Sequence, residues 1–240
     1  MTLDEILASP FGEAHSVVLD GDNLSGRGTL PEGGAVHVLG FAHRAELGVD
    51  QALGLAGRVL DIARTDDGAP LLFLIDSSSQ RMSRRDELMG LSEYLAHLAK
   101  ALLSAEQTGH RTVGLLYGSS AAGAFIATAL ACGVLAALPG AHPEVMDLAS
   151  MARVTKLPLE ILQQRAQTTP VFAPGLENLV LAGAIAEVWD PARRLSGQLA
   201  ALLASPATSD PRGALGKARG GRTKALDIAG TVVALATAHG

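Results

Sequence analysis

The sequence of 240 residues has a single cysteine, Cys132, and aromatic side chains make up only 3% of it. Cys132 lies inside an apolar run, which predicts that it is an inert core residue and not part of a disulfide or a nucleophile. Few rings for base stacking and a net charge of −5 argue against nucleic-acid binding. The first residues lack the positive and apolar regions of a secretory signal, which predicts a cytoplasmic protein.

Charged residues are absent from Thr112 to Ala141, a run that is long enough to span a bilayer. Several glycines and Pro139 divide this run into pieces of strand and helix length. We therefore expect segments that are buried on all sides, and not a membrane helix.

The stretch Thr112–Leu130 has an apolar run, small residues between Gly118 and Gly123, and an Ala-rich run. This order predicts a buried strand, a tight turn and a buried helix. The turn lacks the lysine of a P-loop and the glycine spacing of a nucleophile elbow or a dinucleotide fingerprint. What it offers is main-chain N–H groups at a helix start, which suit an anion or an oxyanion. The alternative is a turn that only packs the helix close to the sheet.

A second strand, 71–75, runs into the small polar residues of 76–80. A capping-box pattern at 83–86 opens an amphipathic helix that Gly109 ends, with Leu88, Leu91, Leu95, Leu98 and Leu102 as its apolar stripe. Parallel strands linked by such a helix bring the turns at Asp76 and Gly118 to one edge of the sheet. Asp76 is a candidate acid or orienting group, and a loop-capping carboxylate is the alternative.

The remaining elements follow from periodicity and turn residues. The pattern predicts strands at 15–19, 35–40, 134–138 and 184–189, with a loop at 20–34. It predicts helices at 50–64, 143–156, 158–168, 176–183, 191–203 and 223–238. We expect a domain over 1–204, a basic Gly/Pro-rich loop over 205–222 and a C-terminal helix over 223–240.

Three segments together resemble the crotonase-type carboxyltransferase family: Pro70–Ser79, the turn Gly118–Ala124 and Ala182–Val188. That family has strand-Asp-Thr-Pro-Gly, Gly-Gly-x-x-Gly-Gly-Ala and Gly-x-Ile-Asp-x-Val at comparable spacings. Within it, the chain is most similar to the gamma subunits of biotin-independent malonate decarboxylases. Ser78 and Ser79 stand where the carboxyltransferase pattern has Pro and Gly, and the turn has fewer glycines, which suits an enzyme that binds no biotin.

The resemblance implies an α/β fold of the crotonase/ClpP type, built of stacked strand-strand-helix units, as a single domain with a helical C-terminal part. It implies a malonate decarboxylase subunit that, with a beta subunit, converts malonyl-S-acyl carrier protein to acetyl-S-acyl carrier protein and CO2. The implied partners are the beta subunit, the acyl carrier protein delta subunit and the alpha subunit, an acyl carrier protein transferase. The delta subunit would supply a phosphoribosyl-dephospho-CoA arm, and neither biotin nor a metal is expected.

Loss of CO2 from a malonyl thioester leaves an enolate, so stabilising its oxygen is the main catalytic demand. We expect the donors to come from the turn and from the end of the preceding strand: Gly118, Ser119, Ser120, Ala121, Ser78 and Ser79. Substrate or prosthetic-arm contacts are expected from Arg81, Arg84, His142 and Arg219. The alternative is a solvated surface for the arginines and a packing or solvent role for His142. His142 is also a candidate proton donor to the product. The seven histidines show no pairing with carboxylates at ligand spacing, so no metal site is expected.

Two other functions are compatible with these residues. One is a serine-dependent thioester hydrolase in which Ser120 is the nucleophile and His142 its base. The other is a non-catalytic scaffold subunit of an acyl-CoA carboxyltransferase-like complex, since the turn has fewer glycines than the family pattern.

Overall fold

The computed structural model describes residues 1–205 and 210–238. The chain divides into two compact units. The first contains Met1–Val145 and the segment that begins at Glu187, and the second contains Met146–Ala186 and the C-terminal helices. The stretch 146–186, which we expected within the first domain, thus belongs to the second unit, and the expected boundaries at 204 and 222 stay a prediction.

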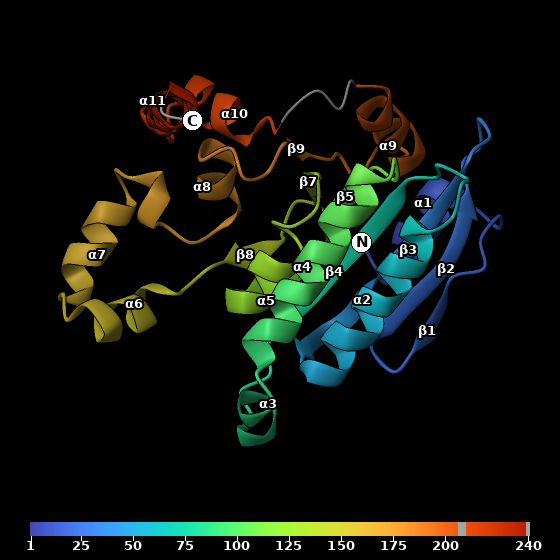
Figure 1. The fold of residues 1–240 in the computed structure, drawn as a ribbon, viewed down its shortest axis with the longest axis horizontal. Coiled ribbons are helices and arrows are strands. Elements are labelled where there is room, and N and C mark those ends of the chain that lie inside the picture. The colour runs from blue at the N-terminus through green and yellow to red at the C-terminus, as the bar shows by residue number, and fades with distance from the viewer. Residues whose placement is uncertain (206–209, 239–240) are drawn as a thin grey trace. The chain divides into compact units, whose positions relative to one another are not determined.

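The first unit is built on a seven-stranded sheet in the order β1-β2-β3-β4-β5-β7-β9, counted over the described residues (Figure 1). From β1 to β3 the strands are antiparallel, and from β3 to β9 they are parallel. The strands are β1 Val18–Asp20, β2 Asn23–Thr29, β3 Ala35–Leu47, β4 Leu71–Gln80, β5 Thr112–Leu116, β7 Val134–Ala137 and β9 Glu187–Val188. A separate parallel pair joins β6 Ser119–Ala121 to β8 His142–Glu144.

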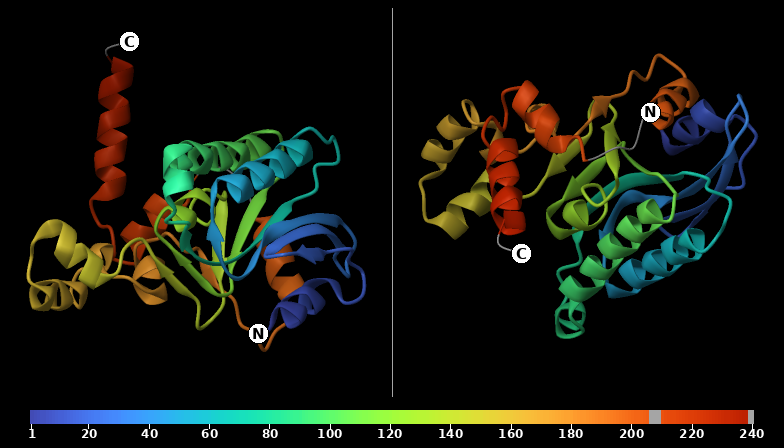
Figure 2. Two further views of the ribbon diagram at one scale, coloured as in Figure 1. Left: turned by 90° about the horizontal axis from the view of Figure 1, so that it is seen from below. Right: turned by 45° about the horizontal axis from the view of Figure 1, so that its top comes forward.

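Helices cover both faces of this sheet because its central strands are apolar on both sides. Leu71–Ile75 in β4 and Val113–Leu116 in β5 are buried throughout. The helices α2 Val49–Ala63 and α4 Leu91–Gln107 lie side by side over one face (Figure 1). The helices α1 Leu3–Phe11 and α9 Leu195–Ala204 pack together on the other side (Figure 2).

The second unit is helical. It contains α6 Leu148–Thr155, α7 Leu159–Ala166, the 3₁₀ turn η1 Pro170–Phe172, α8 Leu176–Leu181, α10 Arg212–Ala218 and α11 Ala225–Ala238. Figure 2 shows α11 as a single straight helix, and none of its residues is buried. Over residues 1–205 and 210–238, no helix combines the length and the apolar character needed to cross a bilayer.

Several sequence predictions need correction. The expected loop 20–34 contains β2, the start of the chain forms α1, and α10 lies within the expected loop 205–222. The predicted turn 76–80 continues β4 as a strand. The helix expected from 83 to 109 is broken at Gly90, whose φ of 82° is left-handed, so α3 Arg84–Leu88 stands apart from α4. Leu88 is consequently 78% exposed instead of part of the apolar stripe.

Candidate active site

The candidate site lies where β4 runs past the end of β5, and Asp76 of β4 contacts the turn that follows β5. β4 and β5 pair in parallel from Leu71↔Thr112 to Ile75↔Leu116, so the residues that follow emerge at one edge, as expected. Asp76 Oδ1 accepts a hydrogen bond of 3.0 Å from the Ser119 N–H. Its Oδ2 accepts one of 3.1 Å from the Arg44 N–H. The loop-capping role considered for Asp76 is therefore confirmed.

The other end of the turn is also held by β4. Gln80 Oε1 accepts a hydrogen bond of 2.8 Å from the Gly123 N–H. Gly118 permits the close approach, because a Cβ built on it would lie 2.1 Å from Asp76 Oδ1. The segment 119–123 is thus fixed at both ends, and the main-chain N–H groups of Ser119 and Gly123 already have acceptors within the chain.

The direction of the remaining N–H groups follows from the strand pairing of β6. N–H groups alternate in direction along a strand. Because the Ser119 N–H points to Asp76 on β4, we expect the Ala121 N–H to point to the same side. Ala122, which follows it, has a left-handed φ of 52°, a conformation that disfavours any residue with a Cβ. Among the four predicted turn residues, Ser119 already donates its N–H to Asp76, and a donor role for Ala121 stays a prediction.

The serines of the site differ in their surroundings. Ser120 and Ser77 are fully buried, and their hydroxyl oxygens are 2.9 Å apart. Ser79 donates its hydroxyl to the Gln80 carbonyl at 2.9 Å. Ser78 Oγ is buried and has no hydrogen-bond partner among the described residues. A buried hydroxyl without a partner is uncommon, so Ser78 is the side chain here that lacks an intramolecular role.

His142 does not meet Ser120. In the β6–β8 pair, His142 is opposite Ser119, and Ser120 is opposite Pro143. Paired residues of parallel strands project to the same face and successive residues to opposite faces. The exposed His142 therefore lies on the face opposite to the buried Ser120. This geometry lacks the nucleophile–base contact that a serine hydrolase requires.

Comparisons with known proteins identify the family. Residues 42–236, which include β4 and the turn, match the family described as malonate decarboxylase gamma subunit. The chain belongs to this family. It is 27% identical over 180 residues to the malonyl-S-ACP:biotin-protein carboxyltransferase MADD of Malonomonas rubra, covering 69% of this chain. It spans 60% of that relative's length.

Solved structures of malonate decarboxylases contain chains with the same fold as this one. A Pseudomonas malonate decarboxylase hetero-tetramer in complex with coenzyme A has a chain with a TM-score of 0.74 and 24% identity, covering 98% of each chain. The Pseudomonas malonate decarboxylase MdcD-MdcE hetero-dimer gives a TM-score of 0.69 and 24% identity, covering 90% of this chain and 95% of that one. The predicted crotonase-type α/β fold is confirmed.

The arginines predicted to contact the substrate or the prosthetic arm have different environments. Arg81 donates to Gln51 Oε1 at 3.2 Å and to the Glu46 carbonyl at 3.4 Å. Arg84, at the start of α3, is exposed and has no partner among the described residues. Its neighbour Arg85 instead forms a two-pronged pair with Asp50 at 2.8 and 3.1 Å. Of these, Arg84 is the guanidinium available to a partner or ligand.

Arg219 has a structural task in the second unit. Its guanidinium donates to the carbonyl oxygens of Val180, Ile185 and Ala186 at 2.7 to 2.8 Å. These bonds fix the segment that follows α8. The role of Arg219 in binding the prosthetic arm stays a prediction, and it would require sharing or releasing these contacts.

Sequence analysis missed a cluster of titratable groups, because its members are distant in the chain. His37, Asp67 and His110 each place one ligand-type atom within 4.8 Å of the others. Arg27 bonds to Asp67 and lies 3.0 Å from His37 Nε2. Both ring nitrogens of His110 face carbonyl oxygens, Ala69 at 2.9 Å and Thr65 at 3.0 Å. Because a guanidinium and two carbonyls already occupy these groups, we interpret the cluster as a structural link and assign no metal to it.

Burial and hydrogen bonding shift the protonation of this cluster. Burial lowers the pKa of His37. Burial alone would raise the pKa of Asp67, but hydrogen bonds from the Ala69 N–H, His37 and Thr65 hold that pKa far below its usual value.

Near the candidate site, burial and the Asp76 carboxylate raise the pKa of Tyr117 well above its usual range. Its hydroxyl donates to the Phe41 carbonyl at 2.9 Å.

Proposed function

We propose that the chain is the gamma subunit of a malonate decarboxylase and that, with a beta subunit, it decarboxylates malonyl-S-acyl carrier protein to acetyl-S-acyl carrier protein and CO2. The observation that carries this proposal is the family match over residues 42–236. The matched range contains the turn that Asp76 and Gln80 hold from either end. A turn fixed in this way supplies the preorganised main chain that oxyanion stabilisation requires.

The proposed chemistry needs no nucleophile on this chain. When the carboxylate leaves as CO2, the bonding electrons move onto the thioester carbonyl oxygen and form an enolate. The Ala121 N–H is the proposed donor to that oxygen, and Ser78 is the second contributor because its hydroxyl has no partner within the described residues. Each donor contributes on the order of 2.7–4 kcal/mol, judged from single-donor deletions in other enzymes. Proton delivery to the acetyl carbon is assigned to His142, which is exposed beside Ser119.

The proposed assembly contains the beta subunit, the acyl carrier protein delta subunit and the alpha transferase subunit. The solved relatives that support a partner are a hetero-tetramer and a hetero-dimer. The substrate would arrive on the phosphoribosyl-dephospho-CoA arm of the delta subunit, in line with the acyl carrier protein in the relative's name. That relative also names a biotin protein. We propose activity without biotin, because Ser78 and Ser79 replace Pro and Gly of the biotin-dependent pattern and Ser119, Ser120, Ala121 and Ala122 stand within its glycine-rich turn. We also propose that the enzyme needs no metal and acts in the cytoplasm.

The test measures CO2 release from a malonyl thioester by this chain, by the beta subunit and by their complex, each with and without added biotin. We expect the complex to release CO2 with or without biotin, and neither separate chain to do so. Release that requires biotin would replace the decarboxylase proposal with carboxyl transfer.

A substitution separates the catalytic role from a scaffold role. Ala121→Leu places a bulky side chain at the proposed donor, and we expect the copurified complex to lose activity. Ala96→Leu is the matched control, because Ala96 is exposed on α4. Full activity of the Ala121→Leu complex would favour the scaffold hypothesis.

A further inference from the structure

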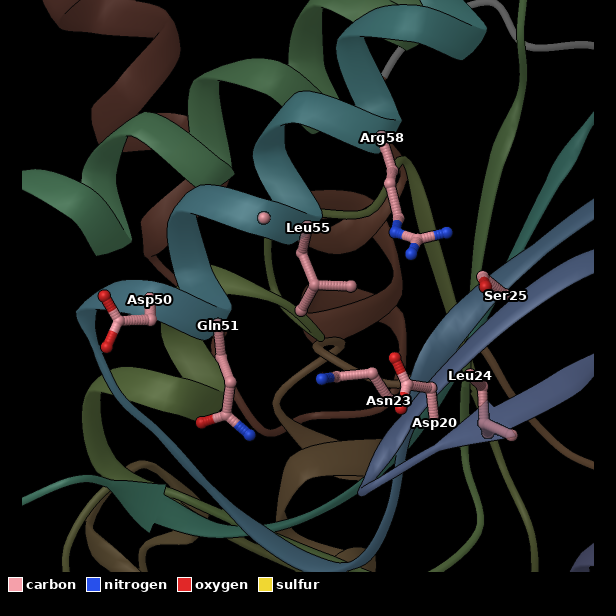
Figure 3. A pocket seen from close by; sticks show the side chains of 9 residues that line it. Asp20, Asn23, Leu24, Ser25, Asp50, Gln51, Leu55 and Arg58 are labelled. Atoms are coloured by element: carbon pink, nitrogen blue, oxygen red, sulfur yellow. The ribbon is translucent and has the colours of Figure 1, made fainter.

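A cavity of about 240 Å³ lies between the β1–β2 hairpin and α2 in the first unit. The hairpin contributes Asp20, Asn23 and Ser25, and the helix contributes Gln51, Leu55 and Arg58. Figure 3 shows these two sets of side chains on opposite sides of the cavity. None of the residues predicted for the decarboxylase site lines it, so it needs an explanation of its own.

Three polar groups that line this cavity, on Asp20, Asn23 and Arg58, lack partners among the described residues. Within the described part of the chain, no interaction is found for the Asp20 carboxylate or the Arg58 guanidinium. Asn23 Oδ1 is buried and has no hydrogen-bond partner there either. Buried polar atoms are rarely left unsatisfied. By contrast, Asp50, which also lines the cavity, is paired with Arg85 at 2.8 Å. Asp20 and Arg58 are exposed at the cavity and have no such partner among the described residues.

The volume limits the size of the ligand. A water molecule takes up roughly 30 Å³ of liquid, so the cavity holds the equivalent of about eight waters. Sites for drug-sized ligands run from roughly 300 to 1,000 Å³. A molecule of about six to ten non-hydrogen atoms fits within this volume, whereas a nucleotide or coenzyme A would extend beyond it.

The charges define the class of ligand. An anion would meet Arg58 but be repelled by Asp20, and a cation would meet Asp20 but be repelled by Arg58. An uncharged molecule would use neither charge, whereas a ligand that carries both signs would pair with both. We propose that the cavity binds a small zwitterion of amino-acid size, whose ammonium lies at Asp20 and Asn23 Oδ1 and whose carboxylate lies at Arg58. Leu55 forms the apolar wall that would face the carbon atoms of the ligand (Figure 3).

The experiment is calorimetric titration of the purified full chain with glycine, alanine, serine and threonine. Acetate and ethylammonium, which each carry one half of the zwitterion, are the comparison ligands. We expect at least one of the four amino acids to bind saturably. We expect acetate and ethylammonium each to bind much more weakly than that amino acid. Absence of binding by all four up to about 10 mM would overturn the proposal, as would equal binding of acetate or ethylammonium.

Variants place the binding in this cavity. Asp20→Asn and Arg58→Gln should each weaken binding at least tenfold. Arg64→Gln is the matched control, because Arg64 follows the same helix and pairs with Asp61 outside the cavity. Unchanged affinity in Asp20→Asn and Arg58→Gln, with melting temperatures that show both are folded, would contradict the assignment. This readout is independent of decarboxylation, so the two proposals can fail separately.

Discussion

The Asp76 carboxylate in β4 accepts a hydrogen bond of 3.0 Å from the Ser119 N–H, in the turn that follows β5. The other carboxylate oxygen binds the Arg44 N–H at 3.1 Å, where His43 and Arg44 both have a left-handed backbone. One side chain of β4 thus holds both the bulge in β3 and the turn after β5. The position of the proposed Ala121 donor depends on this contact, although Asp76 itself is a positioning residue.

Asp76→Asn should therefore lower the turnover of the complex. The amide replaces one of the two oxygens with an N–H donor, so either Ser119 or Arg44 loses its acceptor. Misplacement of a donor by about 1 Å costs roughly 100-fold in rate, and we expect kcat to fall about 10- to 100-fold with a smaller change in KM. Steady-state kinetics of the copurified complex measure this. Asp61→Asn, on the exposed side of α2, is the control, and an unchanged kcat for Asp76→Asn would refute the positioning role.

Ser120→Ala distinguishes a main-chain donor from a serine nucleophile. The Ser120 hydroxyl contacts only Ser77 in a fully buried pair, so its loss should leave decarboxylation nearly intact. Stability should fall by about 1–3 kcal/mol, because the Ser77 hydroxyl is left buried without a partner. Thermal unfolding of Ser120→Ala, Ser77→Ala and the double variant measures the coupling. Abolished turnover in a folded Ser120→Ala protein would instead favour the hydrolase hypothesis.

Ala122→Gly should stabilise the chain. Ala122 has a φ of 52°, and a left-handed conformation costs a residue with a Cβ roughly 1–2 kcal/mol. Glycine removes this strain but loses about 0.5–1 kcal/mol of backbone entropy, so a net gain of about 0.5–1 kcal/mol is expected.

The matched control for this prediction is Ala96→Gly, in the middle of α4, which should lose about 1 kcal/mol. The two variants should shift the melting temperature in opposite directions by about 2–4 °C per kcal/mol. A lower melting temperature for Ala122→Gly would show that the left-handed turn does not strain this protein.

The sequence predicted the centre of the sheet and the edge where the site lies. The apolar runs without charge predicted the buried parts of β4 and β5. The small polar residues after Leu116 marked the end of β5, whereas those at 76–80 continue β4. The bulge at His43–Arg44 and the Asp76 contact to it were not predictable, because the Asp76 carboxylate accepts from a main-chain N–H 32 residues away in the sequence.

The N-terminal errors have a different cause. Gly26 and Gly28 indicated a loop, yet both lie in β2. A Cβ on Gly28 would lie 2.4 Å from the Phe11 ring, and one on Gly26 would lie 2.5 Å from the Ser16 carbonyl. These glycines serve close packing instead of a turn, and a single sequence does not separate the two uses. The cluster of His37, Asp67 and His110 was missed for the same reason as the bulge, since only the folded chain brings its members together.

That cluster predicts how stability depends on pH. Burial lowers the pKa of His37 below its ordinary value of 6.5 in the folded chain, so the unfolded chain binds more protons as the pH falls below 6.5. The free energy of unfolding should then decrease on acidification from pH 6.5. Asp67 has a lowered pKa as well, but its contribution is lost only below its ordinary value of 3.8. Between about pH 5 and pH 7.5, His37 is therefore the member expected to respond.

Denaturant unfolding of the wild type and His37→Gln over this pH range tests the assignment. The variant should lose less stability than the wild type between about pH 7 and pH 5, because it lacks the imidazole that takes up a proton on unfolding. His97→Gln is the control, since His97 is exposed on α4 and should follow the wild-type curve. Parallel curves for wild type and His37→Gln would mean that another group controls the acid sensitivity. A steeper loss in the variant would mean that His37 is protonated in the folded chain and paired with Asp67 as a cation.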